Sequence, residues 1–389
     1  MKRLLSLFVA VSFLMLALVP AFGAVAAEEP TQLQFNENGE FKIVVFSDTQ
    51  DDSFPNRAMI ILIERALREF RPDLVVFDGD NVSQDVNFLN RAAIRQLIEP
   101  VARLGVPYSF VFGNHDAERN VTKQTQLKHY RENGNCLTYN ADDSIHGYGN
   151  CNHTILSSDG QDIAFNIWMI DSNMYHESGG YDIVYPDQVQ WYKRTSEALE
   201  QEAGHKVPSL VFQHIIPPEI FDYLEPAPAG TDLPTKSHAG RGGRYLMQFK
   251  ADANVSPSDY LFQEWPCPPN YNTDEVEVMA ERGDVLGIIS GHDHTNIFTV
   301  HMENGIDLIQ TPGMSYQSYG ADNARGFRVF TLDENDPWSY ETETYTYYEF
   351  MTQDEIVEPI GDALQFFKSL KIIVEVLIES IEEVFAFLK

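Results

Sequence analysis

Cysteine is scarce in this chain of 389 residues, which contains only Cys136, Cys151 and Cys267. No two of them form a C-x-x-C pattern, so we do not expect a zinc site built from thiolates. In an oxidising compartment a disulfide between Cys136 and Cys151 would close a short polar loop. We favour that pairing over three free thiols, and an odd count leaves Cys267 unpaired.

Basic residues are also scarce, because 27 Lys and Arg stand against 58 Asp and Glu, which gives a formal net charge of −31. Such a surface repels polyanions, so we expect no nucleic-acid partner. The chain shows no internal repeat. At 43% hydrophobic and 22% charged residues, its composition is that of a globular protein.

The N-terminal residues 1–27 have the pattern of a secretory signal peptide. Lys2 and Arg3 form the positive end, residues 4–19 the apolar core, and residues 24–27 a small-residue cleavage region. We therefore predict a secreted or periplasmic protein, with a retained membrane anchor as the alternative. Removal of this segment leaves 25 basic against 58 acidic residues, a formal charge of −33.

Beyond the predicted signal, apolar strand patterns alternate with amphipathic helical patterns. This alternation predicts βαβ units in a mainly parallel sheet, within one domain at residues 38–350. The segment 222–272 is rich in Pro and Gly, and we interpret it as a long excursion over the face that carries the polar loops. Short strands near 296–301, 306–310 and 326–332 predict a second, antiparallel sheet. The remaining predicted strands are 41–46, 74–77, 108–112, 163–170, 209–212 and 285–289, and the predicted helices are 56–70, 88–104 and 186–203.

The last predicted element, residues 355–389, is an amphipathic helix. From Ile360 to Leu388 apolar residues recur at spacings of three and four, close to a heptad pattern. Because its other face is acidic and suits anionic membranes poorly, we expect packing on the domain or on a second copy of the chain. Membrane contact is the less favoured alternative. The acidic residues are Glu375, Glu379, Glu382 and Glu383.

Polar side chains follow several predicted strands at the point where each strand ends, which is where such sheets bind ligands. Any one of these motifs alone is typical of a capped turn or of a core histidine. Together they are a ligand set for two divalent or trivalent cations, with Asp80 as the natural bridge. Two such ions activate a water and hold phosphate oxygens, which favours phosphoester hydrolysis. The residues are Asp48, Asp80, Asn114, His214, His292 and His294.

This series of motifs resembles the calcineurin-like metallophosphoesterases over about residues 40–335. The segments 147–150, 171–172, 190–192 and 217–219 resemble more closely a branch related to purple acid phosphatases. The resemblance implies an α/β fold, a four-layer αββα sandwich with two mixed sheets flanked by helices. It rests on Asp48, Gly79-Asp80, Gly113-Asn114-His115-Asp116, His214 and Gly291-His292-Asp293-His294.

The resemblance also implies residue roles. His115 would face the substrate, donating a proton to the leaving oxygen or stabilising the transition state, and Asp116 would orient it. Metal 1 would be held by Asp48, Asp80 and His294, and metal 2 by Asp80, Asn114, His214 and His292.

The chain departs from the family pattern in its first motif, which is usually Asp-x-His and here is Asp48-Thr49-Gln50. Ser83 stands where coloured purple acid phosphatases carry a tyrosine ligand, so no iron–tyrosinate centre is expected. Gln50 offers a neutral oxygen that suits Mn, Mg or Fe over Zn, or it hydrogen-bonds a metal-bound water. In either case we expect metal 1 to be weakly held.

A basic cluster within residues 222–272 is unusual in so acidic a chain. Lys236, His238, Arg241 and Arg244 predict either a solvated loop or a cationic lid, in which Arg241 and Arg244 bind a phosphorylated substrate. The leading hypothesis is an exported phosphoesterase that hydrolyses a small phosphomonoester through a hydroxide bridging two metal ions. The alternatives are a phosphodiesterase or nucleotide pyrophosphatase on the same core, or a non-catalytic metal-binding scaffold. A homo-oligomer through the C-terminal helix is a further expectation.

Overall fold

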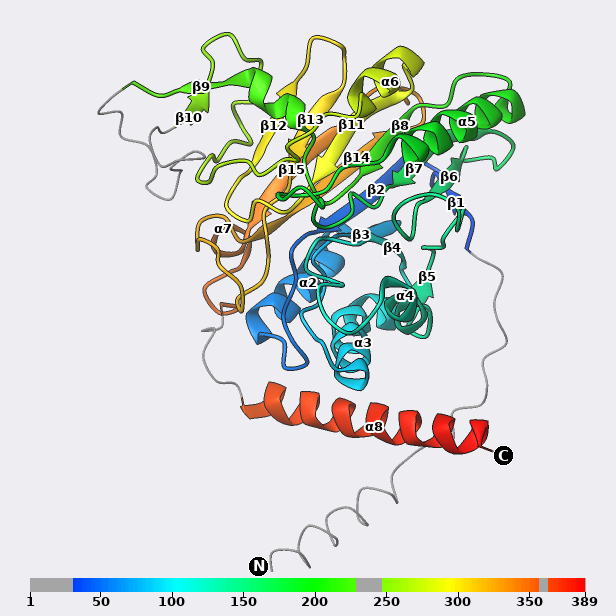
Figure 1. The fold of residues 1–389 in the computed structure, drawn as a ribbon, viewed down its shortest axis with the longest axis vertical. Helices are drawn as coiled ribbons and strands as arrows, with labels where there is room; N and C mark the ends of the chain where they lie inside the picture. The colour runs from blue at the N-terminus through cyan, green and yellow to red at the C-terminus, as the bar shows by residue number, and fades with distance from the viewer. Residues whose placement is uncertain (1–30, 229–246, 357–362, 389) are drawn as a thin grey trace, which may run out of the picture. The chain divides into compact units, whose positions relative to one another are not determined.

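The computed structural model describes residues 31–228, 247–356 and 363–388. Residues Gln32–Lys389 form one compact unit, in which the described strands build two large mixed sheets (Figure 1). The six-stranded sheet contains, in order, β15 (Glu341–Thr346), β14 (Gly326–Asp333), β2 (Glu40–Phe46), β3 (Leu74–Asp78), β4 (Pro107–Val111) and β5 (Asn135–Cys136). The seven-stranded sheet contains, in order, β1 (Leu33–Gln34), β6 (Cys151–Leu156), β7 (Ile163–Met169), β8 (Ser209–Phe212), β11 (Val285–Ser290), β13 (Asp307–Gln310) and β12 (Phe298–His301).

The sheets pack face to face because their strands are apolar on both sides. On β2, Ile43 and Val45 lie in the core between the sheets, together with Leu210 of β8. The alternate residues Val44 and Phe46 face the helices that cover the outer side of the six-stranded sheet. This two-sided burial is what parallel strands require, and it explains the nearly continuous apolar runs in the sequence.

Helices cover the outer face of each sheet. On the six-stranded sheet these are α2 (Arg57–Phe70), α3 (Asn87–Leu104) and α4 (Lys123–Arg131), and on the seven-stranded sheet α5 (Pro186–Ala203) and α6 (Glu275–Arg282). The predicted four-layer αββα architecture is confirmed. The remaining described elements are η1 (Pro218–Tyr223), β9 (Leu224–Pro226), β10 (Met247–Phe249), α7 (Tyr347–Phe350) and α8 (Ala363–Phe387).

The prediction that the last three strands form one antiparallel sheet is wrong. The β12–β13 hairpin joins the seven-stranded sheet, with β13 parallel to β11, whereas β14 pairs antiparallel to β2 in the other sheet. The reason is burial on both faces of β14. Phe327 and Val329 face the helical layer while Phe330 and Leu332 face the core between the sheets, so β14 needs an interior place in its sheet.

The Pro- and Gly-rich excursion at 222–272 contains the short β9–β10 hairpin. Its basic cluster, Lys236, His238, Arg241 and Arg244, lies outside the described residues, as does the predicted signal at residues 1–27. Both therefore stay predictions.

The favoured disulfide is also wrong. Cys136 and Cys151 are both free thiols, on β5 of one sheet and β6 of the other. The Sγ atom of Cys151 lies 3.8 Å from Nε2 of His153. Burial raises the pKa of Cys136 to about 11 and that of Cys151 to about 12, so both stay protonated and unreactive.

The C-terminal helix α8 packs along α3, with Ile373 and Val376 against Ala92. Among the described helices, none has the length and apolar character needed to cross a membrane.

The two sheets are also joined by a buried cation. Arg328 of β14 has no exposed surface, and its Nη2 donates to the carbonyl of Gln310 at the end of β13 (2.9 Å). Its Nη1 lies 2.5 Å from Oδ2 of Asp259. Because removal of one partner leaves the other charge buried and unpaired, we predict that Arg328→Met lowers the free energy of unfolding by about 3–5 kcal/mol.

Urea denaturation measures this loss. Arg103→Met is the control, since Arg103 is exposed and its pair with Glu64 is worth less than about 1 kcal/mol. Equal losses in the two variants would contradict a structural role for the buried charge.

Candidate metal centre

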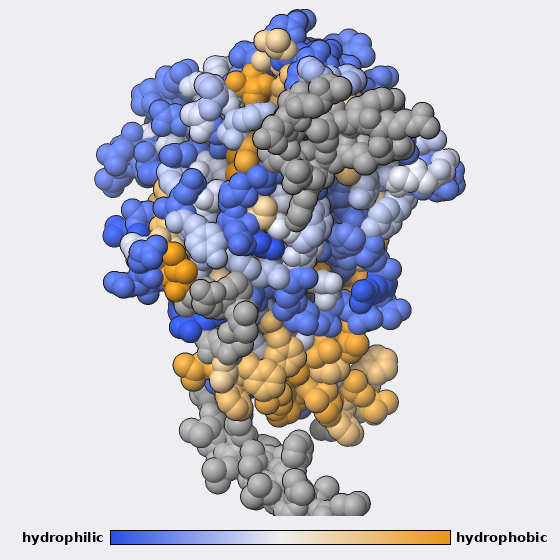
Figure 2. All heavy atoms as spheres, turned by 90° about the vertical axis from the view of Figure 1, so that its left-hand side faces the viewer, coloured by the Kyte–Doolittle hydropathy of each residue, from blue (hydrophilic) through white to orange (hydrophobic). Residues whose placement is uncertain are grey.

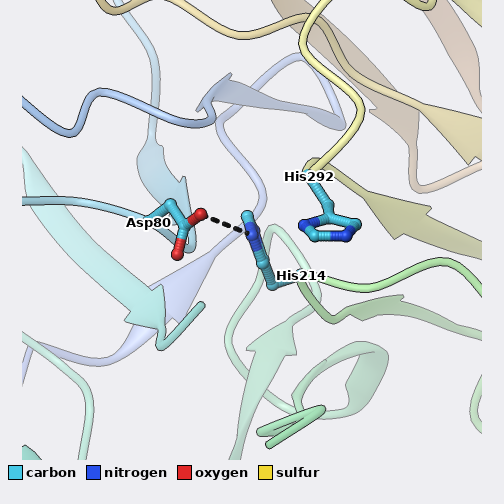
Figure 3. A group of neighbouring side chains, drawn as sticks. All are labelled: Asp80, His214 and His292. Carbon is cyan, nitrogen blue, oxygen red and sulfur yellow. Dashed lines mark ion pairs between the residues drawn. The ribbon is translucent and has the colours of Figure 1, made fainter. Parts of the chain in front are cut away.

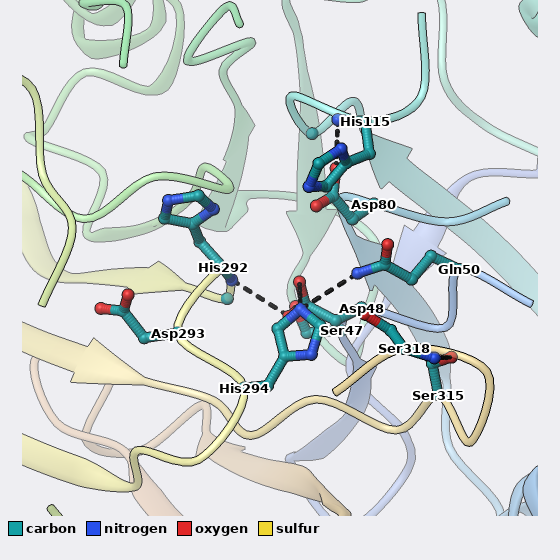
Figure 4. Close-up of polar contacts among 12 residues, drawn as sticks. Ser47, Asp48, Gln50, Asp80, His115, His292, Asp293, His294, Ser315 and Ser318 are labelled. Carbon is teal, nitrogen blue, oxygen red and sulfur yellow. Dashed lines mark hydrogen bonds and ion pairs between the residues drawn. The ribbon is translucent and has the colours of Figure 1, made fainter. Parts of the chain in front are cut away.

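Five loops that leave the carboxyl ends of strands meet where the two sheets pack together. They follow β2, β3 and β4 of the six-stranded sheet and β8 and β11 of the seven-stranded sheet. These loops carry the residues that the sequence predicts as metal ligands, and Figures 3 and 4 show several of them side by side. The fold thus gathers polar side chains that lie far apart in the sequence.

Asp80, His214 and His292 form the tightest group (Figure 3). One ligand atom from each lies within 4.8 Å of the other two, and all three side chains are buried. Oδ2 of Asp80 lies 3.1 Å from Nε2 of His214. Because these are three of the four ligands predicted for metal 2, the group is a candidate cation site.

Several predicted ligand atoms are buried without a hydrogen-bond partner among the described residues. Nearly all buried polar groups in proteins are hydrogen-bonded, so such a cluster is expected where a cation completes the coordination. Carboxylate, carboxamide and imidazole donors suit divalent transition metals such as Mn, and they also suit Mg. The side chains present therefore fit a metal ion. Oδ1 of Asn114 and Nε2 of His292 have no partner, whereas Oδ1 of Asp48, Oδ2 of Asp80 and Nε2 of His214 have only ion-pair contacts within the cluster itself.

Asp48, His294 and Gln50 form a second group beside the first (Figure 4). Oδ1 of Asp48 lies 3.2 Å from Nε2 of His294 and 3.8 Å from Nε2 of His214. Nε2 of Gln50 lies 3.0 Å from Nε2 of His294, so the amide donates to the nitrogen that would bind metal 1. As a ligand, Gln50 would have to present its oxygen instead.

Backbone carbonyls fix which ring nitrogen of two histidines faces the site. Nδ1 of His214 donates to the carbonyl of Asp78 (2.9 Å), and Nδ1 of His294 donates to that of Tyr319 (2.8 Å). Each bond leaves Nε2 as the ligand atom, the arrangement in which a second partner orients a metal-binding imidazole. The ring of Tyr319 also stacks on His294, with 4.0 Å between ring centroids.

The backbone is strained at the same place. Asp48, Asp80 and His292 have φ of 49°, 48° and 73°, which non-glycine residues seldom adopt and which is common at functional sites. The backbone N–H of His292 donates to Oδ2 of Asp48 (3.0 Å), which helps hold the conformation. Position 291 accepts only glycine, because the Cβ atom of any other residue would lie 1.7 Å from Oγ of Ser47.

Burial and neighbouring charges determine which side chains of the site are protonated. Burial lowers the pKa of His214, but the charges of Asp80 and Asp48 outweigh it and raise that pKa to about 10. Burial, with the charge of His214, lowers the pKa of His292 to about 3. Burial alone would raise the pKa of Asp80, but the charge of His214 lowers it below its usual value. Without a cation, His214 therefore carries the balancing positive charge.

The predicted role of Asp116 is wrong. Its carboxylate accepts from the backbone N–H groups of Gly113 (2.8 Å) and Asn81 (2.9 Å), so it holds loops together and does not orient His115. Burial, and then the charge of Asp80, raise the pKa of Asp116 to about 7. The carboxylate beside His115 is Glu118, whose Oε2 lies 2.8 Å from Nδ1 of His115.

Sequence reasoning missed Glu118 and Tyr175. The Tyr175 hydroxyl donates to Glu118 and accepts from Nδ2 of Asn114 (3.0 Å), which leaves Oδ1 of Asn114 without a partner. A usable signal was present, because a carboxylate three residues after a histidine can fold back onto it. No pattern in the sequence singled out Tyr175.

A polar pocket of about 370 Å³ adjoins Gln50. Its lining contains one basic residue, Arg119, whose Nη1 lies 3.7 Å from Oδ2 of Asp85. Ser83, the residue at the missing tyrosine position, also lines the pocket. The other lining residues are Asp52, Gln84, Asp85, Gln317 and Ser318.

Metal binding should depend strongly on pH. Because a cation binds only the neutral imidazole and the pKa of His214 is raised to about 10, its proton must leave throughout the neutral range. We predict that Mn²⁺ affinity rises about tenfold per pH unit from pH 7 to 9. Calorimetry in buffers of different ionisation enthalpy counts the released protons. An affinity that levels off above pH 7 would contradict the raised pKa.

The two ions should differ in affinity because Gln50 replaces a histidine at metal 1. We predict that dialysed protein keeps about one ion per chain, and that Gln50→His keeps about two. Elemental analysis after dialysis measures this, with Gln84→His in the same pocket as the control. Two tightly held ions in the unchanged protein would show that Gln50 does not weaken the binding of metal 1.

Comparison with known proteins agrees with this geometry. The family model for the calcineurin-like phosphoesterases matches residues 41–296. Two relatives from Arabidopsis thaliana are named probable inactive purple acid phosphatase 14 and 29. They are 30% and 28% identical to this chain, over 74% and 85% of it and the same shares of their own lengths.

A third relative, phosphatase DCR2 of Saccharomyces cerevisiae, is 24% identical over 74% of this chain and 49% of its own length. The family model spans more than half of the chain, and the purple-acid-phosphatase relatives cover most of it. The protein therefore belongs to the calcineurin-like phosphoesterase family, in its branch related to purple acid phosphatases.

Proposed function

We propose that the protein is an active phosphoesterase that uses two metal ions to hydrolyse a small phosphomonoester. The observation that carries the proposal is the buried cluster of ligand atoms on Asp80, His214 and His292, whose only ion pair is within the cluster, with Asp48 and His294 beside it. When bound, the ions would supply positive charge that lowers the pKa of a water and neutralises phosphoryl oxygens.

The chain's own residues would then handle the leaving group. His115 is partly exposed next to Asn114, so its imidazole can reach a bound ester and donate a proton to the leaving oxygen. Glu118 accepts from Nδ1 of His115, which leaves Nε2 as the nitrogen that would donate the proton. Tyr175 donates to Glu118 and accepts from Asn114, so one hydrogen-bond network positions both His115 and Asn114.

The polar pocket beside Gln50 supports a hydrophilic substrate. Its described lining contains no aromatic side chain on which a nucleobase could stack, and its one basic residue, Arg119, is paired with Asp85. This supports a phosphomonoester over a nucleotide pyrophosphatase substrate. We also propose that Arg241 and Arg244 contact the substrate, and the N-terminal pattern at residues 1–27 supports export.

A second candidate is a metal-binding protein without catalysis. Its support is specific: two relatives carry the word inactive in their names, and Gln50 replaces a histidine. The ordered His115–Glu118 pair favours the enzyme, because a scaffold has no need of an oriented proton donor.

Hydrolysis of p-nitrophenyl phosphate and of its bis-ester by the Mn²⁺-loaded protein separates these candidates. We predict faster hydrolysis of the monoester. His115→Ala should lower kcat at least about 100-fold, because a general acid contributes on that order. Glu118→Gln should lower kcat about 10-fold with little change in KM and should shift the pH profile.

Glu303→Gln, an exposed change on the far hairpin, serves as the control and should leave kcat unchanged. If the loaded protein turns over neither ester while its ions remain bound, the non-catalytic candidate stands. If His115→Ala keeps full activity, the proposed proton donor is wrong.

A further inference from the structure

The C-terminal helix α8 meets the rest of the chain through its acidic edge. Nη2 of Arg95 lies 2.6 Å from Oε2 of Glu379, and Nη1 of Arg91 lies 3.1 Å from Oε1 of Glu383. At the other end of the helix, Nζ of Lys368 lies 3.4 Å from a carboxylate oxygen of Glu99. Together with the small contact at Ile373 and Val376, these pairs fix which face of α8 looks inward.

The opposite face of α8, here called the outward face, is apolar and exposed (Figure 2). Its least exposed member is Leu377 at 39% and its most exposed is Leu388 at 72%. Figure 2 shows these side chains gathered along the helix, in contrast to the mostly hydrophilic surface above it. The outward face consists of Phe367, Leu370, Val374, Leu377, Ile378, Ile381, Val384, Phe385 and Leu388.

This face is too large to be an ordinary feature of a monomer. Nine large apolar side chains, each about half exposed, with Leu364, Phe366 and Phe387 beside them, offer on the order of 1,000 Å² of apolar surface. The largest patch on a typical monomer is about 300–600 Å². A stable protein–protein interface needs about 800 Å² from each partner, so the outward face is large enough for one.

The spacing on the outward face is that of a coiled-coil seam. Residues 367, 370, 374, 377, 381, 384 and 388 alternate steps of three and four without a break. Val374 and Ile381 occupy one set of seam positions and Leu370 and Leu377 the other, so large aliphatic side chains fill both sets, as a coiled-coil seam requires. A helix lying in a lipid surface needs a wide apolar face but no such repeat.

The charges of α8 also favour a partner helix over a lipid surface. They further favour an antiparallel orientation of the two helices. Lys371, whose ion pair is with Glu375 of the same helix, lies in the first half of α8, whereas Glu382 lies in the second half. An antiparallel partner would set each basic end beside the acidic end of the other helix, and would also oppose the two helix dipoles. An anionic membrane, in contrast, would meet a protein of net charge −31.

We propose that the outward face of α8 is the interface of a homodimer, in which two α8 helices pack antiparallel across a two-fold axis. Val374 of one helix then lies opposite Leu377 of its partner copy, and Leu370 opposite Ile381. Lys371 lies beside Glu382 of the second copy. This pairing does not depend on the proposed phosphatase activity.

Sedimentation equilibrium of the purified chain, with its N-terminus read by mass spectrometry, tests the proposal. We expect a dimer at micromolar concentration. Ile381→Lys should raise the dissociation constant at least about 100-fold, because it places a charge in the seam. Ile381 is exposed and makes no contact with the core, so the variant should keep its unfolding transition. The control is Trp338→Lys, a similar change at an exposed apolar residue outside α8, which should leave the dimer intact.

A charge exchange tests the orientation. Lys371→Glu should weaken the dimer, and adding Glu382→Lys to the same chain should restore it, because the two positions meet only between antiparallel copies. A chain that stays monomeric at a concentration on the order of 100 micromolar would overturn the proposal, and so would a dimer that survives Ile381→Lys. Binding of a monomer to phosphatidylcholine vesicles, abolished by Ile381→Lys, would assign the face to lipid instead. Loss of association in Lys371→Glu without rescue by Glu382→Lys would overturn the antiparallel pairing.

Discussion

The burial of acidic side chains next to imidazoles at the ends of apolar strands is the constraint on which the rest of the site depends. Asp48 and Asp80 lie fully inside the protein, where an isolated carboxylate is costly. Their neighbours His214 and His294 offset that cost, and the backbone at Asp48, Asp80 and His292 is bent into a strained conformation to bring them close. A protein keeps such an arrangement where function requires it, and a cation would balance it best.

The two-sheet architecture is what makes this convergence possible. Each sheet supplies loops from the carboxyl ends of its parallel strands, and the packed faces bring the two sets of loops together. Family membership accounts for the order of the motifs, and the two relatives named as inactive make the chemistry of this chain the open question. The His115–Glu118 pair and the polar pocket near Gln50 are the features that favour catalysis.

The sequence was sufficient to predict the layers and the gathering of the polar strand ends, because apolar runs and their terminal residues are local signals. It was insufficient where the outcome depends on distant partners. Asp116 stands next to His115 in the sequence, yet its carboxylate is occupied by backbone N–H groups, and Glu118 takes its place. The periodicity of residues 360–388 predicted a two-faced helix, but Arg91 and Arg95 on α3 determine that the acidic edge faces inward.

The central proposal is that two groups of ligands, joined through Asp80, would hold a pair of ions. Anomalous diffraction from a crystal soaked in Mn²⁺ tests it most directly. The account predicts two peaks about 3.5–4 Å apart, one against His214 and His292 and one against Asp48 and His294, with Asp80 touching both. A single peak away from Asp80, or no peak among these side chains, would contradict it.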